Sequence, residues 1–474
     1  MISLFDYQQV AVDEVRDVYA SGFRAPLLVL PTGGGKTICF TYITGKAQQK
    51  GLRVLLLAHR RELVGQISSA LKAWDVPHGV IRADAKPTSH GVQVGMVQTL
   101  ANRIKLDKAG RFRFDLVIVD EAHHATKNST WGAILAHNAG ARILGVSATP
   151  CRLDGKGLGV DADGFFDSII VGPTVSDLIG RGRLAEPVVY APALGLDLSG
   201  VKKRGGDYVA SQLAGAVDRS AITGDAVAHY RRYCDRQSAI AFTVTTDHAG
   251  HVAEQFKAAG YQAAVLTGST PDKERARMIR DLGCGGLQVL ASCNVVSEGT
   301  DIPAVAAAIL LRPTASYALA MQQIGRALRV FPGKSRAIIL DHADNVRRHG
   351  LPTDEVEWSL AGVRRKGQLP VKKCFECEAL VSAAAAVCPG CGHRFAVPAG
   401  QEAMPVRDAV EVRAGELVEM TPEMMEQVRQ RKRSELIRAR SKADLIRLGE
   451  SRHYKNPEFW AGKILEERQQ WSRA

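Results

Sequence analysis

The sequence lacks an apolar run of the length that crosses a membrane. Its longest runs, such as "AVAAAILL" from Ala304 to Leu311, are far shorter than the roughly 18 residues that a membrane-spanning helix needs. The first residues also lack a basic stretch followed by an apolar core, so they do not have the pattern of a secretory signal. These absences exclude the membrane class and favour a cytoplasmic protein.

The chain is also short of acidic side chains. Asp and Glu number 49 against 62 Lys and Arg, which gives a formal net charge of +13 and an isoelectric point near 9.4. A basic surplus of this kind favours a polyanionic partner such as nucleic acid. At 474 residues the chain is too long for one core and predicts two or three domains. Composition alone leaves ribosomal, regulatory and enzymatic functions open.

Cysteine is scarce, yet four of the nine cysteines lie within the eighteen residues "CFECEALVSAAAAVCPGC". Paired cysteines at short spacing in a cytoplasmic protein indicate metal binding or redox chemistry more often than disulfides. Two C-x2-C pairs ten residues apart suit a tetrahedral Zn²⁺ bound by Cys374, Cys377, Cys388 and Cys391. An iron–sulfur cluster or a redox dithiol is the alternative. The isolated cysteines are expected to be core residues; they are Cys39, Cys151, Cys234, Cys284 and Cys293.

Short apolar runs alternate with helical patterns in two separate parts of the chain. The first series lies at 25–30, 53–59, 92–97, 115–120 and 141–149, and the second at 238–244, 262–268, 287–292, 306–313 and 335–341. Strands that are continuously apolar and separated by helices predict parallel sheets covered on both faces. The fold class is therefore α/β with two tandem domains.

The predicted boundaries follow from where this alternation starts and stops. We expect a first domain at 1–155, a connector at 156–222, a second domain at 223–350, a basic linker at 351–373, a zinc ribbon at 374–395 and a basic helical region at 396–474.

The segment "LPTGGGKT" lies between an apolar strand and a helical stretch, which is the context of a phosphate-binding loop. Glycines let backbone N–H groups approach phosphates, a lysine supplies positive charge, and a threonine can bind Mg²⁺. The predicted nucleotide-binding residues here are Thr32, Gly33, Gly34, Gly35, Lys36 and Thr37. Leu30 stands where the strict motif has its first glycine. A glycine turn followed by a chance Lys-Thr is the alternative.

A second feature, which is acidic, follows about eighty residues after the phosphate loop. Here "LVIVDEAHH" ends an apolar strand in Asp120 and Glu121. Carboxylates at the carboxyl end of a parallel strand lie where ligands of open α/β sheets bind. Asp120 can hold Mg²⁺ and Glu121 can orient a water molecule. A merely solvated strand end is the alternative for this pair alone.

Together these motifs resemble those of superfamily 2 helicases of the DEAD/DEAH-box type, with "PTGGGKT" as motif I and "DEAH" as motif II. In that family the position of Leu30 is commonly not glycine. "SAT" matches motif III, so the resemblance implies that Ser147 and Thr149 couple hydrolysis to the grip on nucleic acid. The fold implied is a pair of RecA-like P-loop NTPase domains.

Three further segments resemble other motifs of this family. "AHRRELVGQ" is similar to motif Ia and "VQTL" to the next strand-binding motif, which implies that Arg61 and Thr99 contact the sugar-phosphate backbone. A solvated surface arginine is the alternative for Arg61. "LFDYQ" resembles the adenine-reading segment, in which the amide of Gln8 would pair with the base.

The second series of strands carries the remaining family motifs. "NVVSEGTDIPAV" resembles motif V, which implies that Gly299 and Asp301 contact the nucleotide. "QQIGRALR" matches motif VI, and Gln322, Arg326 and Arg329 recur at helical spacing on one face. Arginines of a neighbouring domain can stabilise charge on the γ-phosphate.

The closest resemblance is to RadD-like bacterial DNA-repair helicases, which place a four-cysteine zinc module after the second motor domain. It implies an ATP-, Mg²⁺- and Zn²⁺-dependent helicase or translocase acting on single-stranded or junction-containing DNA, with repair or replication proteins as partners. The alternatives are an ATPase that remodels protein–DNA complexes without separating strands, as in restriction-type or phage-borne motors, an RNA helicase, and a DNA-binding scaffold with an inactive motor.

Overall fold

The computed structural model describes fourteen stretches of the chain, and everything below concerns these alone. They are residues 3–85, 88–107, 110–152, 155–191, 198, 201–204, 206–217, 220–293, 305–364, 371–373, 380–382, 393–394, 441–451 and 458. The four cysteines predicted to bind zinc, the motif V residues Gly299 and Asp301, and most of the predicted C-terminal region lie outside them. In the part of the chain that is described, no helix is both long and apolar enough to cross a membrane.

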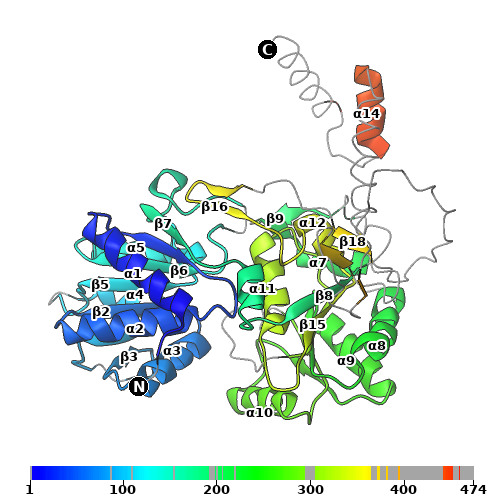
Figure 1. The fold of residues 1–474 in the computed structure, drawn as a ribbon, viewed down its shortest axis with the longest axis horizontal. Coiled ribbons are helices and arrows are strands. Elements are labelled where there is room, and N and C mark those ends of the chain that lie inside the picture. Colours follow the sequence, from blue (N-terminus) through cyan, green and yellow to red (C-terminus); the bar gives the residue numbers. More distant parts are fainter. Residues whose placement is uncertain are drawn as a thin grey trace.

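The first domain is built on a seven-stranded parallel sheet of order β3-β4-β2-β5-β6-β1-β7 (Figure 1). Its strands are β1 (Pro26–Val29), β2 (Val54–Ala58), β3 (Gly79–Ile81), β4 (Val92–Met96), β5 (Leu116–Asp120), β6 (Arg142–Ser147) and β7 (Ser168–Val171). Alternate residues of the central strands face opposite ways. Leu28 and Leu56 pack under α1 (Asp6–Ala20), α2 (Lys36–Gln49) and α3 (Arg61–Ala73), while Leu27 and Leu55 pack under α4 (Val97–Lys105) and α5 (Thr130–His137).

The second domain repeats this arrangement with a six-stranded parallel sheet of order β12-β13-β11-β14-β15-β8. Its strands are β8 (Glu186–Tyr190), β11 (Ala239–Phe242), β12 (Ala263–Leu266), β13 (Val289–Ser292), β14 (Ala307–Leu310) and β15 (Arg336–Asp341). One face is covered by α8 (Ser220–Cys234) and α9 (Thr246–Ala258). The other face is covered by α6 (Val175–Gly180), α10 (Asp272–Gly283), α11 (Tyr317–Leu328) and α12 (Asn345–His349). The predicted α/β class with two parallel sheets is confirmed.

The segment 156–222, which we expected to be a connector, supplies an edge strand to each sheet. β7 pairs with β1 of the first sheet, and β8 pairs with β15 of the second. Both strands are short and flanked by Gly, Pro and charged residues, so neither continues the strand-helix alternation. The same segment also contains η2 (Val160–Ala162), the hairpin β9 (Lys203–Arg204) and β10 (Asp207–Tyr208), and α7 (Ala210–Val217).

The predicted linker 351–373 also contains structure, because a hairpin of β16 (Glu357–Ser359) and β17 (Gly362–Arg364) returns to the first domain. The backbone N–H groups of Gly157 and Gly159 donate to the carbonyl oxygens of Ala361 and Leu360 at 3.1 and 2.9 Å. Figure 1 shows β16 beside β7, far along the chain from it. The hairpin therefore connects the end of the second domain to the first. Beyond it lie the pair β18 (Val371–Lys373) and β19 (Leu380–Ser382), and α14 (Lys442–Ser451).

The isolated cysteines divide into two groups. Cys39, Cys151, Cys234 and Cys293 are buried, as predicted for core residues. Cys284 is exposed, so the prediction is wrong there, because this residue caps the C-terminal end of α10 and does not lie on its apolar face.

Candidate nucleotide site between the two domains

A cavity of about 520 Å³ lies between the carboxyl ends of the strands of the first sheet and helix α11 of the second domain. Its lining comes from both domains and comprises Thr32, Gly33, Gly35, Lys36, Thr37, Ile38, Leu63, Gln66, Asp120, Glu121, Arg183, Gln322, Arg326, Arg329 and Val330. The volume falls in the range of about 300 to 1,000 Å³ that is typical of small-molecule sites. Most of the predicted nucleotide residues of both domains thus surround one space.

The loop after β1 forms the floor of this cavity. Gly33 and Gly35 have φ angles of 86° and 84°, a left-handed conformation that other residues rarely adopt. Gly35 is the N-cap of α2, so the helix begins at Lys36 and directs its first backbone N–H groups at the cavity. Such a helix start favours anions, because unpaired N–H groups and the helix dipole both point outward.

Lys36 is half-buried, and its Nζ donates to the carbonyl oxygen of Leu30 at 3.3 Å. Burial lowers the pKa of this ammonium, while the nearby carboxylates of Glu121 and Asp120 act in the opposite direction. A phosphate group in the cavity would supply the negative charge that favours the ammonium form.

The acidic side of the cavity is formed where β5 ends. Asp120 is buried, and burial together with the carboxylate of Glu121 raises the pKa of Asp120 to about 7. Glu121 has a φ of 50°, a left-handed conformation that is strained for a residue with a side chain. Its Oε2 is buried, accepts no hydrogen bond from any described residue, and lies 3.4 Å from Nδ1 of His123 in η1 (Ala122–His124).

These observations fit a divalent cation. Two carboxylates at one strand end repel each other, and a hard cation with oxygen ligands removes that cost. Asp120 and the hydroxyl of Thr37 both line the cavity and are suitable ligands for Mg²⁺. The described stretches contain no group of three or more His, Cys, Asp or Glu side chains arranged for a metal, so a cation here would depend on Asp120, Thr37 and the phosphates of a bound nucleotide.

The opposite side of the cavity is formed by α11, which lies between the two sheets in Figure 1. Gln322, Arg326 and Arg329 line the cavity, and the first two are buried. The helix approaches the phosphate loop so closely that a Cβ atom on Gly325 would lie 2.6 Å from Cβ of Thr32. The arginines therefore reach a space whose floor belongs to the other domain.

The segment predicted to read adenine caps α1 and lies beside the phosphate loop. Gln8 is buried, and its Oε1 accepts from the backbone N–H of Phe5 at 3.0 Å, which caps α1. Gln8 is not part of the cavity lining given above, although its Nε2 would lie 2.2 Å from a Cβ atom on Gly35. Arg183 does line the cavity and lies over the ring of Phe5, 3.6 Å from its centroid.

Sequence reasoning missed Arg183, Leu63 and Gln66 as cavity residues. Arg183 belongs to the segment expected to be a connector, and no motif marks it. Leu63 and Gln66 lie in the stretch resembling motif Ia, which drew attention to nucleic acid rather than to the nucleotide. Gly34 lies within the phosphate loop but is not among the residues that line the cavity.

The residues predicted to contact nucleic acid lie outside the nucleotide cavity. Arg61 has a side chain that is 52% exposed, and it pairs with Asp84 at 3.2 Å and with Asp272 of the second domain at 4.0 Å. Its neighbour Glu62 pairs with Arg275 of α10. Thr99 is half-buried on α4. Charged contacts between the domains therefore flank the position of Arg61.

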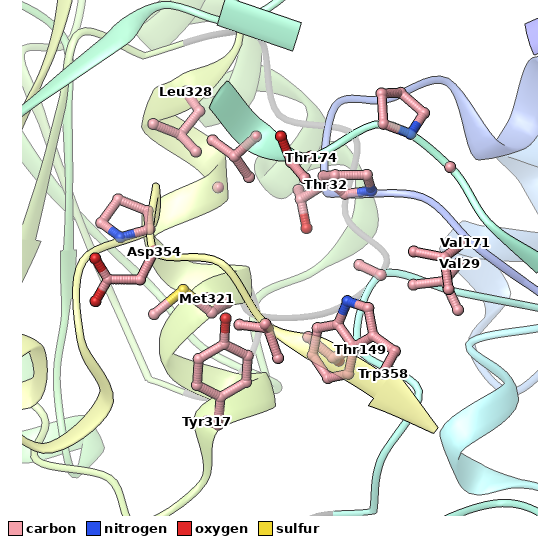
Figure 2. A pocket seen from close by; sticks show the side chains of 18 residues that line it. Val29, Thr32, Thr149, Val171, Thr174, Tyr317, Met321, Leu328, Asp354 and Trp358 are labelled. Carbon is pink, nitrogen blue, oxygen red and sulfur yellow. The ribbon is translucent and has the colours of Figure 1, made fainter. Parts of the chain in front are cut away.

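A second, smaller cavity of about 100 Å³ lies on the other side of α11. Figure 2 shows Tyr317 and Met321 of α11 on one side, Val29 and Val171 on the other, and Trp358 of the hairpin between them. The rings of Tyr317 and Trp358 are 5.9 Å apart. The lining of this smaller cavity is mostly apolar. Because α11 borders both cavities, it contacts the first domain on two flanks.

The predicted coupling residues lie at the end of β6, and Thr149 borders this second cavity. The hydroxyl of Ser147 donates to the carbonyl oxygen of Thr149 at 2.9 Å and accepts from its backbone N–H at 3.2 Å. Thr149 is buried and lines the smaller cavity beside Tyr317. The end of β6 thus lies against the helix that carries the cavity's arginines.

Two family models match the chain in the regions that form these two domains. The type III restriction enzyme res-subunit model matches residues 1–152, and the helicase conserved C-terminal domain model matches residues 226–331. With the tandem parallel sheets and the cavity between them, these matches show that the chain belongs to the superfamily 2 helicases.

Similar proteins come from phage and from yeast. A 51.5 kDa protein of a Lactococcus phage is 32% identical, with 82% of each chain covered. The IRC3 protein of Saccharomyces cerevisiae, whose name describes it provisionally as an ATP-dependent helicase, is 30% identical over 71% of this chain and 51% of its own length. The chain therefore spans about half of that yeast relative.

Solved structures share the fold. An HsdR subunit fragment of a type I restriction enzyme from Vibrio vulnificus superposes with a TM-score of 0.56 at 20% identity, covering 73% of this chain and 65% of the fragment. The DUF1998 helicase MrfA bound to DNA superposes with a TM-score of 0.51 at 16% identity, covering 82% of this chain and 58% of MrfA. The predicted closeness to RadD-like helicases is not among these findings.

Proposed function

We propose that this chain is a motor that hydrolyses ATP with Mg²⁺ and uses the cycle to move along or unwind DNA. The observation that carries the proposal is the composition of the cavity, in which Lys36 and Glu121 of one domain face Arg326 and Arg329 of the other. A site that needs groups from two domains is complete only when the domains are closed. Opening and closing of this kind converts hydrolysis into movement.

In this mechanism the chain holds the nucleotide by its phosphates. The N–H groups at the start of α2 and the ammonium of Lys36 would contact the β- and γ-phosphates, and Thr37 and Asp120 would bind Mg²⁺. When bound there, Mg²⁺ would supply positive charge that lessens the repulsion between the phosphates and a nucleophile. Arg183 and Phe5, already stacked at the rim, are placed to contact the base.

Glu121 would then orient the attacking water and accept its proton. Its strained backbone and buried Oε2 hold the carboxylate at the cavity edge beside His123. Arg326 and Arg329 would stabilise the charge that develops on the γ-phosphate, and Gln322 would align beside them.

DNA is the polyanion that we propose as partner, with single-stranded or junction-containing forms preferred. The net charge of +13 supports a nucleic acid, and one of the similar structures is a helicase bound to DNA. In this proposal Arg61 leaves Asp272 and contacts a phosphate when DNA binds, and Thr99 contacts the same strand. Ser147 and Thr149 would transmit the change to α11. A role in repair or recombination, as in RadD-like helicases, is the finer form of the proposal.

The test compares ATP hydrolysis with single-stranded DNA, duplex DNA, forked DNA and RNA in parallel, with Glu121→Gln as the matched control. We expect stimulation by a DNA form that Glu121→Gln abolishes. Hydrolysis by the wild type that Glu121→Gln leaves unchanged would contradict the assigned site, and stimulation by RNA alone would contradict the DNA assignment. A strand-displacement assay run in parallel separates unwinding from translocation without unwinding. Translocation alone is the alternative that the similarity to a restriction-enzyme subunit supports.

The zinc ribbon remains part of the proposal through its sequence. A segment of eighteen residues with "SAAAA" at its centre has too little apolar surface to offset its ordering entropy, whereas structural zinc contributes about 10 to 16 kcal/mol in comparable peptides. We expect one Zn²⁺ per chain, lost in Cys388→Ser while basal ATP hydrolysis continues. Metal analysis without zinc, or a visible iron–sulfur absorbance, would contradict the assignment.

A further inference from the structure

Lys334 lies between α11 and β15, and its side chain reaches back toward the end of the helix. Its Nζ donates to the carbonyl oxygens of Val305 at 2.7 Å, of Arg329 at 2.8 Å, and of Ala327. An ammonium has three protons to donate. All three of them are therefore used on backbone carbonyls, and none of the mechanism above requires this residue.

These bonds fix the end of the helix that carries the arginines. The last carbonyls of any α-helix have no partner inside the helix. At the end of α11, the Nζ of Lys334 donates to the carbonyl oxygens of Ala327 and Arg329. The backbone N–H of Ala185 donates to the carbonyl oxygen of Leu328 at 2.7 Å. Arg329 is the C-cap residue, with an extended backbone at φ −64° and ψ 137°. The carbonyl groups of Ala327, Leu328 and Arg329, where the chain leaves the helix, are thus all hydrogen-bonded.

The turn that carries Lys334 is itself tightly built. The backbone N–H of Lys334 donates to the carbonyl oxygen of Phe331 at 3.1 Å, and Gly333 has a φ of 84°. The Nζ also lies 5.4 Å from the centroid of the Phe331 ring, within the range of a cation–π contact. Burial lowers the pKa of Lys334 to about 7, as expected for an ammonium that protein rather than water surrounds.

The third carbonyl extends the connection to another predicted motif. Val305 is buried two residues before β14 and is the first described residue after 294–304, the sequence that holds Gly299 and Asp301. One side chain therefore joins the end of motif VI to the end of motif V. A lysine serving only general stability has no need to cap the very residue whose side chain lines the nucleotide cavity.

We propose that Lys334 is a positioning residue for Arg329: by capping the end of α11 and fixing it to β14, it holds the Arg329 side chain where the γ-phosphate is hydrolysed. The aliphatic stem of Arg329 passes close to the phosphate loop, 3.6 Å from where a Cβ atom on Gly33 would lie. Fraying of the last turn would withdraw the guanidinium from that place. The inference rests on the proposed ATPase function.

The experiment is a double-mutant cycle on DNA-stimulated ATP hydrolysis by the full chain, using Lys334→Met, Arg329→Ala and the double variant. A misplacement of about 1 Å can cost about 100-fold in rate, so Lys334→Met should lower kcat about 10- to 100-fold. The KM for ATP should change less than about threefold, because Lys36 and the phosphate loop are untouched. In the Arg329→Ala background the same change should cost less than about twofold, because the group that Lys334 positions is gone.

The exposed lysine of a surface ion pair, Lys257, provides the matched control, and Lys257→Met should leave kcat unchanged. Lys334→Arg, which keeps the charge and two or more donors, should restore part of the lost kcat. If Lys334→Met does not fold, the cycle is run with Lys334→Arg and the same non-additivity is expected. A normal kcat in Lys334→Met, or an equal loss in both backgrounds, would overturn the inference alone. A wild type without ATP hydrolysis would instead overturn the proposed function and this inference with it.

Discussion

Replacing Gly325 by alanine tests how closely the two domains must approach. Gly325 lies in the interior of α11, where an added Cβ atom would be 2.6 Å from Cβ and 2.8 Å from Cγ2 of Thr32. Carbon atoms in contact are normally about 3.5 to 4.0 Å apart, so α11 must move back from the phosphate loop by about 1 Å. The change costs nothing within the helix itself, because alanine is favoured over glycine there by about 1 kcal/mol.

Gln322, Arg326 and Arg329 move with the helix, so the catalytic arrangement is lost while the fold is kept. We expect Gly325→Ala to lower the DNA-stimulated kcat about 100-fold, equivalent to about 2.7 kcal/mol in the activation barrier. The melting temperature should stay the same or rise. Steady-state ATPase kinetics and a thermal melt on the same preparation measure both.

The matched control is Gly250→Ala in α9, where an added Cβ atom meets no described atom within 4 Å. This variant should gain the same helix stability and keep its kcat. A Gly325→Ala protein with a kcat within about twofold of the wild type would refute the reasoning, because it would show that the site forms without the close contact of α11 with Thr32.

Two other predictions concern the nucleotide groups and the stability of the second domain. Lys36→Ala should weaken ATP binding by about 100-fold, because removing the lysine from its charge pair with the phosphates costs about 3 kcal/mol. Glu121→Gln should keep the affinity for ATP and lower kcat by about 10² to 10⁴. Fluorescent-nucleotide binding and steady-state turnover separate the two effects, and normal turnover by either variant contradicts the assignment. Burial and the neighbouring His229 lower the pKa of His342 to about 3. Between about pH 6.5 and 3 the unfolded chain therefore binds a proton that the native protein excludes. As the pH is lowered through this range, the free energy of unfolding decreases by about 1.4 kcal/mol per pH unit. Between pH 7 and pH 5, urea unfolding should therefore show that His342→Asn loses about 2 kcal/mol less unfolding free energy than the wild type, and equal losses would contradict the prediction. Burial raises the pKa of Asp341 to about 6, which acts in the opposite direction but is present in both proteins.

The two parallel sheets were predictable because buried parallel strands are apolar throughout. β2, with the sequence "VLLLA", is buried at every position, and so is β5, with "LVIVD". Continuous runs of this kind have no other common explanation when helix-length segments separate them. Some strand content was expected in the connector, but the positions of β7 and β8 in the two sheets were not, because each occupies a sheet edge and adds only a short run to a stretch that is otherwise rich in glycine and charge.

The cavity residues that could be predicted are those whose chemical type and position after a strand suit phosphate or metal. Glycines with positive φ beside a lysine, and two acids at a strand end, have few uses other than phosphate and metal. Arg183 could not be predicted, because it precedes β8, whose partner β15 is far along the chain. Trp358 could not be predicted either, because its hairpin docks on the first domain through bonds from Gly157 and Gly159, about 200 residues earlier in the chain. The contact of Gln8 with a base stays a prediction; the structure adds that its side-chain oxygen accepts from the backbone N–H of Phe5 and caps α1.

The central claim is that the two domains share one catalytic site, and Arg329→Ala tests it most directly. The measurement is the DNA-stimulated kcat for ATP beside the dissociation constant for ATP, in the wild type and in this variant. The account predicts a kcat at least about 10³-fold lower with ATP affinity changed only a few-fold, because Arg329 acts on the charge of the transition state rather than on the bound nucleotide. A kcat within about twofold of the wild type would show that the second domain supplies no catalytic group.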